Sequence, residues 1–394
     1  MAGALEGIRV LDMGRVISAP MCSMILADMG AEVIKVEQPD CGDDCRTWSP
    51  VKNGESAYFA HFNRGKKGIT LNLKTGKAAF LKMVSNVDIL VENFRPGVMK
   101  KLGLGYEDLK AVNPRLIYAS ISGFGQNGPD CQRAGYDTIA QARSGLMSIT
   151  GFPGNPPVRC GASIADIMAG LHATIGILSA LQHRHRTGEG QYIDVSLTDA
   201  AVFAAASVFE VYLGSGKIVR RMGNGYEATA PGGGYHAKDG YVVFSCGNQK
   251  RYEKLCELMG RPDLVTHPDY LTESLRVKNR PALDRAIEEW TTTLSERELL
   301  DTLIGAGFAC THIATVDQVV KDPQVAEARN MFPTIHQPGF GELQVINQVA
   351  KLSGTPAGPQ GAAPTLGQHN EQVYKGVFGF TEEELEQLRA ARAI

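Results

Sequence analysis

Short apolar runs alternate with helix-like stretches along the first half of the chain. The runs are rich in β-branched and other apolar residues and lie at 7–13, 32–37, 68–73, 88–93 and 115–121. The stretches between them, such as 20–30 and 75–87, have the composition of helices or loops. A helix over 165–184 and a strand over 191–195 continue the alternation. Because strands separated by helices pair in parallel, the pattern predicts an α/β domain with a mostly parallel sheet covered on both faces.

The chain changes character near residue 214. Residues 198–216 predict a second long helix, rich in small residues, and residues 214–230 then form a linker rich in Gly and Arg. The large domain is therefore expected to span 1–213. A smaller α+β domain is expected over 231–325, from a strand and amphipathic helices at 241–246, 251–260, 280–294 and 295–307.

The last segment of the chain, 326–394, has its own elements. Residues 341–354 predict a strand or a hairpin. A helix follows near the end, and it opens with Thr381 and, three residues on, Glu384. This spacing is that of a capping box.

The composition is that of an ordinary globular protein, with 394 residues, 43% of them hydrophobic, and a formal net charge of −2. The near-neutral charge argues against nucleic acid as a partner. No signal peptide is recognisable, and Asp166 and His172 interrupt the longest apolar stretch, so no membrane association is expected. Eight scattered cysteines fit reduced thiols in a cytoplasmic protein. The close pair Cys41 and Cys45 lacks further ligands at metal-site spacing, so no metal is expected.

Two nucleotide-binding motifs are missing from the chain. The first predicted strand is followed by GRVISAP, which lacks the glycines of the dinucleotide fingerprint, and no Walker sequence occurs. A nicotinamide dehydrogenase and a P-loop kinase are therefore excluded. The FRPG turn after the strand at 88–93 carries Asn93, Arg95, Lys100 and Lys101, which form either a solvated basic turn or a site for a polyanion.

Five long blocks of this sequence resemble the class III CoA-transferase (CaiB/BaiF, formyl-CoA transferase-like) family. They are 10–46, 71–84, 88–129, 133–151 and 161–200, in the family's order. The resemblance implies a large Rossmann-like domain and a smaller domain, with the segment 326–394 returning to complete the large one. It also implies a homodimer of two interlocked rings, and CoA and acyl-CoA as substrates, with no tightly bound cofactor.

The resemblance also assigns candidate residues, residue by residue. The family's catalytic carboxylate falls on Asp166, which on its position alone is either a helix cap or a nucleophile. The implied CoA contacts are Val16, Gln38, Leu73, Lys74, Asn93, Phe94, Arg95, Lys101, Arg133, Gly135 and Tyr136. Many members have a basic residue at the position of Gln38, so one phosphate or adenine contact is in question.

The family's reaction transfers CoA between two carboxylates. A carboxylate nucleophile forms a mixed anhydride and then an aspartyl-CoA thioester, which conserves the energy of the thioester. A helix N-terminus and an ordinary carboxylate pKa of about 3.9 would keep Asp166 ionised, whereas burial would oppose ionisation. Oxyanion donors are expected from backbone N–H groups of Gly135 or of Gly232, Gly233 and Gly234, although the triplet is equally well a flexible turn.

Two other functions remain alternatives. An α-methylacyl-CoA racemase of this family uses a His before an Asp, but here Tyr136 precedes Asp137, and a tyrosine with a pKa near ~10 is a poor base at neutral pH. A non-catalytic CoA-binding relative is the other alternative. His172 is expected to be a core residue.

The motifs do not identify the donor and acceptor acids. Ile17 stands where the oxalate-handling branch has a polar residue, and the glycine run at 232–234 is short. Together with Met21 and Met147, which are otherwise ordinary core residues, Ile17 favours an apolar or aryl acid over oxalate.

Overall fold

The computed structural model describes residues 3–226 and 228–394. The chain forms two compact units. The large unit comprises Met1–Leu146, Arg159–Ala206 and Pro323–Ile394. The small unit comprises Met147–Val158 and Ser207–Asp322. Each unit has its own hydrophobic core, and the two are described separately below.

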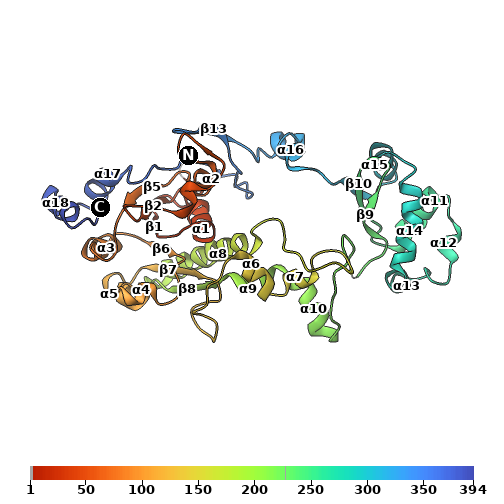
Figure 1. The fold of residues 1–394 in the computed structure, drawn as a ribbon, viewed down its shortest axis with the longest axis horizontal. Helices are drawn as coiled ribbons and strands as arrows, with labels where there is room; N and C mark the ends of the chain where they lie inside the picture. Colours follow the sequence, from red (N-terminus) through yellow and green to blue (C-terminus); the bar gives the residue numbers. More distant parts are fainter. Residues whose placement is uncertain (1–2, 227) are drawn as a thin grey trace. The chain divides into compact units, whose positions relative to one another are not determined.

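A six-stranded parallel sheet forms the centre of the large unit, as the alternation of strands and helices predicts (Figure 1). Its strand order is β5-β2-β1-β6-β7-β8. This is the order of a Rossmann-like sheet, in which the direction of winding reverses between β1 and β6. The strands are β1 (Arg9–Asp12), β2 (Glu32–Glu37), β5 (Lys67–Thr70), β6 (Ile89–Glu92), β7 (Ile117–Ser122) and β8 (Tyr192–Ser196).

Helices cover both faces of this sheet because alternate strand residues are apolar on each face. On one face, Leu11, Ile34 and Leu90 pack against α3 (Lys77–Val84), α5 (Tyr106–Val112), α17 (Asn370–Gly376) and α18 (Glu382–Ala390). On the other face, Val10, Val33 and Ile117 pack against α1 (Ser18–Asp28), α8 (Ile164–Thr187) and α9 (Leu197–Ala204). Shorter elements of the unit are β3 (Val51–Lys52), β4 (Glu55–Ser56), α2 (Ala57–Asn63), α4 (Val98–Lys101) and α6 (Asp137–Arg143).

The end of the chain covers the edge strand of the sheet. The side chains of His369 and Asn370 accept hydrogen bonds from the backbone N–H groups of Gly68 and Thr70, at 3.0 and 2.9 Å. The final helix, α18, begins with the predicted capping box of Thr381 and Glu384. The predicted strand at 341–354 is half of a short hairpin, formed by β12 (Thr334–Gln337) and β13 (Gly341–Gln344).

The small unit has a three-stranded antiparallel sheet in the order β11-β10-β9. Its strands are β9 (Gly232–His236), β10 (Tyr241–Ser245) and β11 (Ala309–His312). Its helices are α7 (Leu146–Ile149, which begins at the boundary of the unit), α10 (Ala206–Ser215), α11 (Gln249–Leu258), α12 (Asp263–Thr266), α13 (Glu273–Lys278), α14 (Arg280–Thr291), α15 (Glu296–Gly305) and α16 (Val316–Val319). Phe244, Leu255 and Ile287 lie in the core between the sheet and the helices.

Two sequence expectations about these elements need correction. The single helix predicted over 198–216 is two helices, α9 and α10, separated at Ala205. The run contains neither Gly nor Pro near the break, so the sequence carries no signal for it. The glycine triplet 232–234 is part of strand β9 and pairs with β10, which rules out a flexible turn between strands.

The helix α8 is long and apolar enough to cross a membrane by length and composition alone. Its buried residues include Ala169, Ala173 and Ile177, and they pack in the core with residues of α1 and the sheet. In this structure α8 is therefore a core helix of the large unit.

Candidate active site

A cavity of about 610 Å³ lies in the large unit, at the carboxyl ends of the parallel strands. This edge is where open α/β sheets bind ligands, next to the reversal between β1 and β6. The walls come from the segments that follow five strands, β1, β2, β6, β7 and β8, and from the first turn of α8. The lining residues are Arg15, Val16, Ile17, Ser18, Asp44, Trp48, Asn93, Phe94, Arg95, Pro96, Val98, Ile121, Ser122, Gly123, Arg133, Ala134, Gly135, Tyr136, Asp166 and Leu197.

Nine of the residues that the sequence assigns to a site share this cavity. They are Val16, Ile17, Asn93, Phe94, Arg95, Arg133, Gly135, Tyr136 and Asp166. Arg95, Arg133 and Tyr136 are exposed, whereas Ile17 is buried. The cavity thus combines one carboxylate on a helix with cationic side chains at its exposed parts, which is a suitable environment for an anionic substrate.

Asp166 lies in the first turn of α8, partly buried. Burial, together with the nearby carboxylate of Asp137, raises the pKa of Asp166 to about 7, although a hydrogen bond from Ser18 lowers it. The carboxylate makes no ion pair with any residue that the structure describes. Burial is the force that the sequence analysis expected to oppose ionisation of Asp166, and it is the largest cause of the raised pKa.

The backbone N–H groups at the start of α8 are bonded by Asp137, not by Asp166. The Oδ1 of Asp137 accepts hydrogen bonds from the backbone N–H groups of Ala165 and Asp166, at 2.9 and 3.5 Å. The amide of Gln141 donates to its Oδ2 at 2.7 Å. The buried carboxylate of Asp137 therefore caps α8 from a neighbouring helix. Asp166 is the third residue of α8 and is not its cap.

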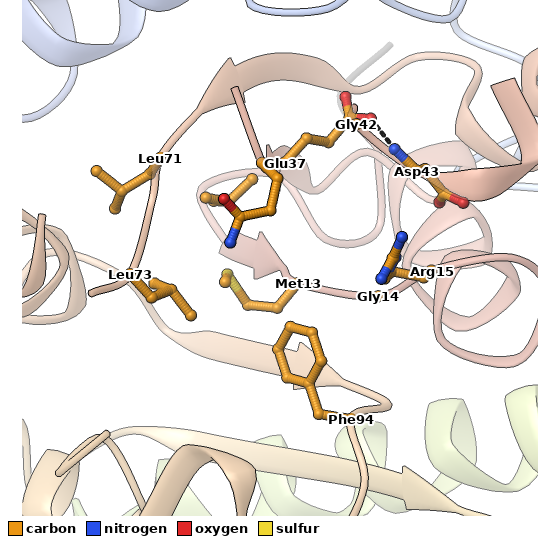
Figure 2. Close-up of a pocket in the computed structure, with 11 residues that line it drawn as sticks. Met13, Gly14, Arg15, Glu37, Gly42, Asp43, Leu71, Leu73 and Phe94 are labelled. Atoms are coloured by element: carbon orange, nitrogen blue, oxygen red, sulfur yellow. Dashed lines mark hydrogen bonds between the residues drawn. The ribbon is translucent and has the colours of Figure 1, made fainter. Parts of the chain in front are cut away.

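A second, smaller cavity of about 110 Å³ lies beside the first (Figure 2). The two cavities share Arg15 and Phe94. Apolar side chains of Met13, Leu73 and Phe94 surround the space in Figure 2, and Gln38 also lines it. Three of the implied CoA contacts, Gln38, Leu73 and Phe94, thus line this cavity, and the first two follow β2 and β5.

Five of the assigned residues line neither cavity. Lys74 and Lys101 are exposed in the large unit. Gly232, Gly233 and Gly234 belong to the small unit, where all three line a cavity with Arg280 and Asp284. Their assignment as oxyanion donors stays a prediction. Of the residues expected to favour an apolar acid, only Ile17 lines the cavity of Asp166, since Met21 does not and Met147 belongs to the small unit.

The turn between β1 and α1 carries Arg15 and Val16 into the large cavity. The side chain of Asn93 holds this turn through Arg15, accepting from its N–H and donating to its C=O, both at 2.9 Å. Val16 has a φ of 68°, in the left-handed region. A β-branched residue there costs on the order of 1–3 kcal/mol and persists only where the surrounding structure imposes it.

Buried charged side chains lie directly under this turn. Lys35 pairs with Asp43 at 2.9 Å, and Lys66 pairs with Asp12 at 2.8 Å, all four side chains being buried. Burial would raise the pKa of Asp43, but Lys35 and further hydrogen bonds lower it to about 2. For Lys66, burial has the larger effect and lowers the pKa to about 8, although the attraction of Asp12 raises it. The ion pairs therefore hold Asp12 and Asp43 as carboxylates at neutral pH.

The sequence reasoning missed several residues at this site. Arg15 lines both cavities, although only its neighbour Val16 was predicted to lie at the site. Ser18, the first residue of α1, forms a side-chain hydrogen bond with Asp166. Asp43 belongs to CGDDC, which was judged only as a metal motif. The sequence did carry a signal for the buried ion pairs. Lys35 and Asp12 lie inside predicted buried strands, and buried charges need partners.

The fold and the cavity define a class of protein, an α/β enzyme with a carboxylate in a site for an anionic substrate. Comparison with known families then identifies the family. CoA-transferase family III matches residues 5–370 of the chain. The chain belongs to this family, and it is an enzyme that uses CoA thioesters and carboxylates.

Relatives that are named as CoA-transferases match most of the length of the chain. It is 38% identical to succinyl-CoA–D-citramalate CoA-transferase of Chloroflexus aurantiacus over 99% of this chain and 98% of that protein. It is 42% identical to acetyl-CoA:oxalate CoA-transferase of Acetobacter aceti over 84% of this chain and 85% of that protein. It is 35% identical to human succinyl-CoA:glutarate CoA-transferase over 99% of this chain and 90% of that protein.

Solved structures share the fold. A CaiB/BaiF family protein from Brucella suis is 38% identical and superimposes with a TM-score of 0.85, over 96% of this chain and 100% of that chain. Rv3272 from Mycobacterium tuberculosis, in its orthorhombic crystal form, is 32% identical with a TM-score of 0.84, over 94% of this chain and 99% of that chain. These likenesses support the parallel-sheet fold of the large unit.

Proposed function

We propose that this enzyme moves CoA from an acyl-CoA donor to a free carboxylic acid, with Asp166 as the nucleophile. The observation that carries the proposal is the state of Asp166. It lines the cavity without an ion-pair partner among the described residues, whereas the other lining carboxylate, Asp44, is paired with Arg15 at 2.7 Å. A carboxylate with a raised pKa is less stabilised as an anion, and it is therefore a better nucleophile.

The transfer runs through two kinds of covalent intermediate on Asp166. The carboxylate attacks the thioester carbonyl, the C–S bond breaks, and an aspartyl mixed anhydride and CoA thiolate form. The thiolate then attacks the aspartyl carbonyl, releasing the donor acid and leaving an aspartyl-CoA thioester. The acceptor carboxylate attacks this thioester, which expels CoA thiolate and forms a second mixed anhydride. The thiolate then attacks the acyl carbonyl of the acceptor, which releases the new acyl-CoA and frees the carboxylate of Asp166. No step consumes water, so the thioester bond energy is conserved.

We propose a short dicarboxylic acid as the acceptor, with succinyl-CoA or acetyl-CoA as the donor. The support comes from the relatives named for citramalate, oxalate and glutarate. Arg95 and Arg133 at the cavity supply cations for a second carboxylate or for the phosphates of CoA. Of the three residues on which the apolar-acid hypothesis rests, only Ile17 lines the cavity. A panel of dicarboxylic and aryl acids with both donors, read by mass spectrometry of the acyl-CoA products, tests this, and turnover of aryl acids alone would overturn it.

The alternative racemase reaction is less well supported. It would use residues 136 and 137 as its acid and base. Tyr136 is 72% exposed, and Asp137 is buried with both of its carboxylate oxygens bonded. Asp137 therefore holds α8 in place and is not free to shuttle a proton.

We further propose that the enzyme acts as a homodimer. The support on the surface of the large unit is a pair of exposed apolar side chains on the packed helices α8 and α9, Ile175 at 57% and Phe203 at 62% exposed. Exposed apolar patches are typical of interfaces. Light scattering of the purified protein tests it, with a dimer mass expected and a monomer mass contradicting it. A cytoplasmic location and the absence of a tightly bound cofactor stay predictions from the sequence.

The variant Asp166→Asn tests the nucleophile. It keeps the shape of the side chain but cannot form the anhydride, so kcat is expected to fall by at least about a thousandfold. The dissociation constant for CoA, measured by calorimetry, is expected to stay within about threefold. Transfer at the rate of the unaltered enzyme would show that Asp166 is not the nucleophile.

A further inference from the structure

The loop of residues 41–45 contacts the cavity-lining turn through the exposed side chain of Asp44, which pairs with Arg15, and through the buried side chain of Asp43. Asp43 accepts the backbone N–H of Val16 with both carboxylate oxygens, at 3.1 and 3.2 Å. Val16 is the residue with the left-handed φ of 68°. Because this hydrogen bond is made by the N–H of Val16 itself, it directly affects the conformation of the strained residue.

The side chain of Asp43 is itself fixed from three directions. Lys35 donates to its Oδ2 at 2.9 Å, and the same ammonium group donates to the C=O of Gly14 at 2.8 Å. The N–H of Cys45 donates to its Oδ1 at 3.1 Å. Its own backbone N–H donates to Glu37 at 2.9 Å, as Figure 2 shows. A rigid carboxylate thus meets the turn at a defined place.

The residues on either side of Val16 are held independently. Gly14 donates its N–H to Asp12 at 2.8 Å, and a Cβ at this position would lie 2.4 Å from that of Ala19. Arg15 is bonded by Asn93 through its backbone and pairs with Asp44 through its exposed side chain. Removing the contact with Asp43 would therefore free Val16 alone, and a valine released from this contact relaxes toward negative φ.

We infer that Asp43 is a positioning residue for CoA binding, which holds Val16 in the left-handed conformation that shapes the wall of the larger cavity. The inference rests on the proposed function in taking CoA as the ligand of these cavities. It assigns to the loop 41–45 a role in binding that is exerted through Val16. Asp43 also lines the smaller cavity, and the Val16→Gly rescue described below distinguishes the role through Val16 from a direct contact with the ligand.

Two matched double variants test this inference. Both replace Lys35 by Met, so that no buried ammonium is left without a partner. Asp43→Asn/Lys35→Met keeps an oxygen that can accept the N–H groups of Val16 and Cys45. Asp43→Ser/Lys35→Met keeps a helix-capping group for Cys45, but its shorter side chain does not reach Val16. The two proteins therefore differ in the contact with Val16.

Calorimetric titration of each full-length variant with CoA gives the readout. The serine variant is expected to bind CoA at least tenfold more weakly than the asparagine variant, which stays within about threefold of the unaltered protein. Adding Val16→Gly to the serine variant is expected to recover at least threefold, because glycine adopts this φ without strain. Equal dissociation constants for the two double variants, or no recovery with glycine, would overturn the inference.

The fold of each variant is checked by thermal unfolding. If the serine variant does not fold, Asp43→Ala/Lys35→Met takes its place. The expected weakening of CoA binding and the result that would overturn the inference stay the same. Because the readout is binding, it separates this inference from the proposed function. An enzyme that binds CoA but does not transfer it would count against the function alone, whereas equal binding by the matched variants would count against Asp43 alone.

Discussion

Charged side chains are arranged in opposite ways at two places beside the same cavity. Under the turn at 13–17, Asp12 and Asp43 each face a buried lysine. At the first turn of α8, Asp166 has a second carboxylate for a neighbour and a pKa raised to about 7. Pairing fixes a side chain in place and keeps it charged, whereas the absence of a cation leaves a carboxylate less stable and more reactive. The first arrangement holds the turn that lines the cavity, and we propose that the second supplies the nucleophile.

Removing one member of a buried pair should produce the largest effect. In Asp12→Ala, the ammonium of Lys66 stays buried without its carboxylate, and the hydroxyl of Ser23 and the N–H of Gly14 lose an acceptor. We expect a loss of about 3–5 kcal/mol in the free energy of unfolding, measured by urea denaturation.

The exposed pair of Arg15 and Asp44 is the matched control. Asp44→Ala is expected to cost less than about 1 kcal/mol, because solvent screens an exposed pair. Equal losses in the two variants would mean that the buried pairs do not differ from surface pairs, and the comparison would fail.

Activity should depend on pH through the ionisation of Asp166. With a pKa of about 7, kcat/KM is expected to fall tenfold per pH unit below pH 7. Ser18→Ala removes a hydrogen bond that lowers this pKa, so the acid limb is expected to move to higher pH. A limb below pH 5, or a shift to lower pH in the Ser18 variant, would contradict the raised pKa.

The same pKa predicts a smaller effect on stability. The folded pKa of Asp166 lies above its value in the unfolded chain, so its contribution to stability is present below the unfolded pKa and is lost as pH rises through about 7. Asp166→Asn never ionises and avoids this loss. We expect its Tm to exceed that of the unaltered protein by about 3 °C at pH 8 and by at most half as much at pH 5. A lower Tm at pH 8 would show that the carboxylate is stabilised in the folded state.

Much of the large unit could be predicted from the sequence because its signals are local. The apolar runs at 7–13, 32–37 and 88–93 became strands β1, β2 and β6, and the long apolar stretch from 165 became α8. The position of Asp166 in a cavity followed from resemblance to the family. The strand and helix predictions used residues that are close together in the sequence, whereas the resemblance drew on blocks spread over residues 10–200.

The remaining features depend on contacts between distant residues. The hydrogen bond from Val16 to Asp43 joins positions 27 apart in the sequence, and the cap of α8 comes from Asp137, 28 positions before Ala165. The φ of Val16 is set by these tertiary contacts and opposes the residue's own preference. The pKa of Asp166 likewise depends on burial and on Asp137, which a linear motif does not show.

The central claim is that Asp166 forms a covalent bond with the acyl group and then with CoA. The most direct test is to incubate the enzyme with succinyl-CoA, quench with hydroxylamine, digest, and examine the peptides by mass spectrometry. We predict a hydroxamate on the peptide that contains Asp166, absent with free CoA and absent in Asp166→Asn. A hydroxamate on another residue, or none in an enzyme that transfers CoA under the same conditions, would contradict this claim.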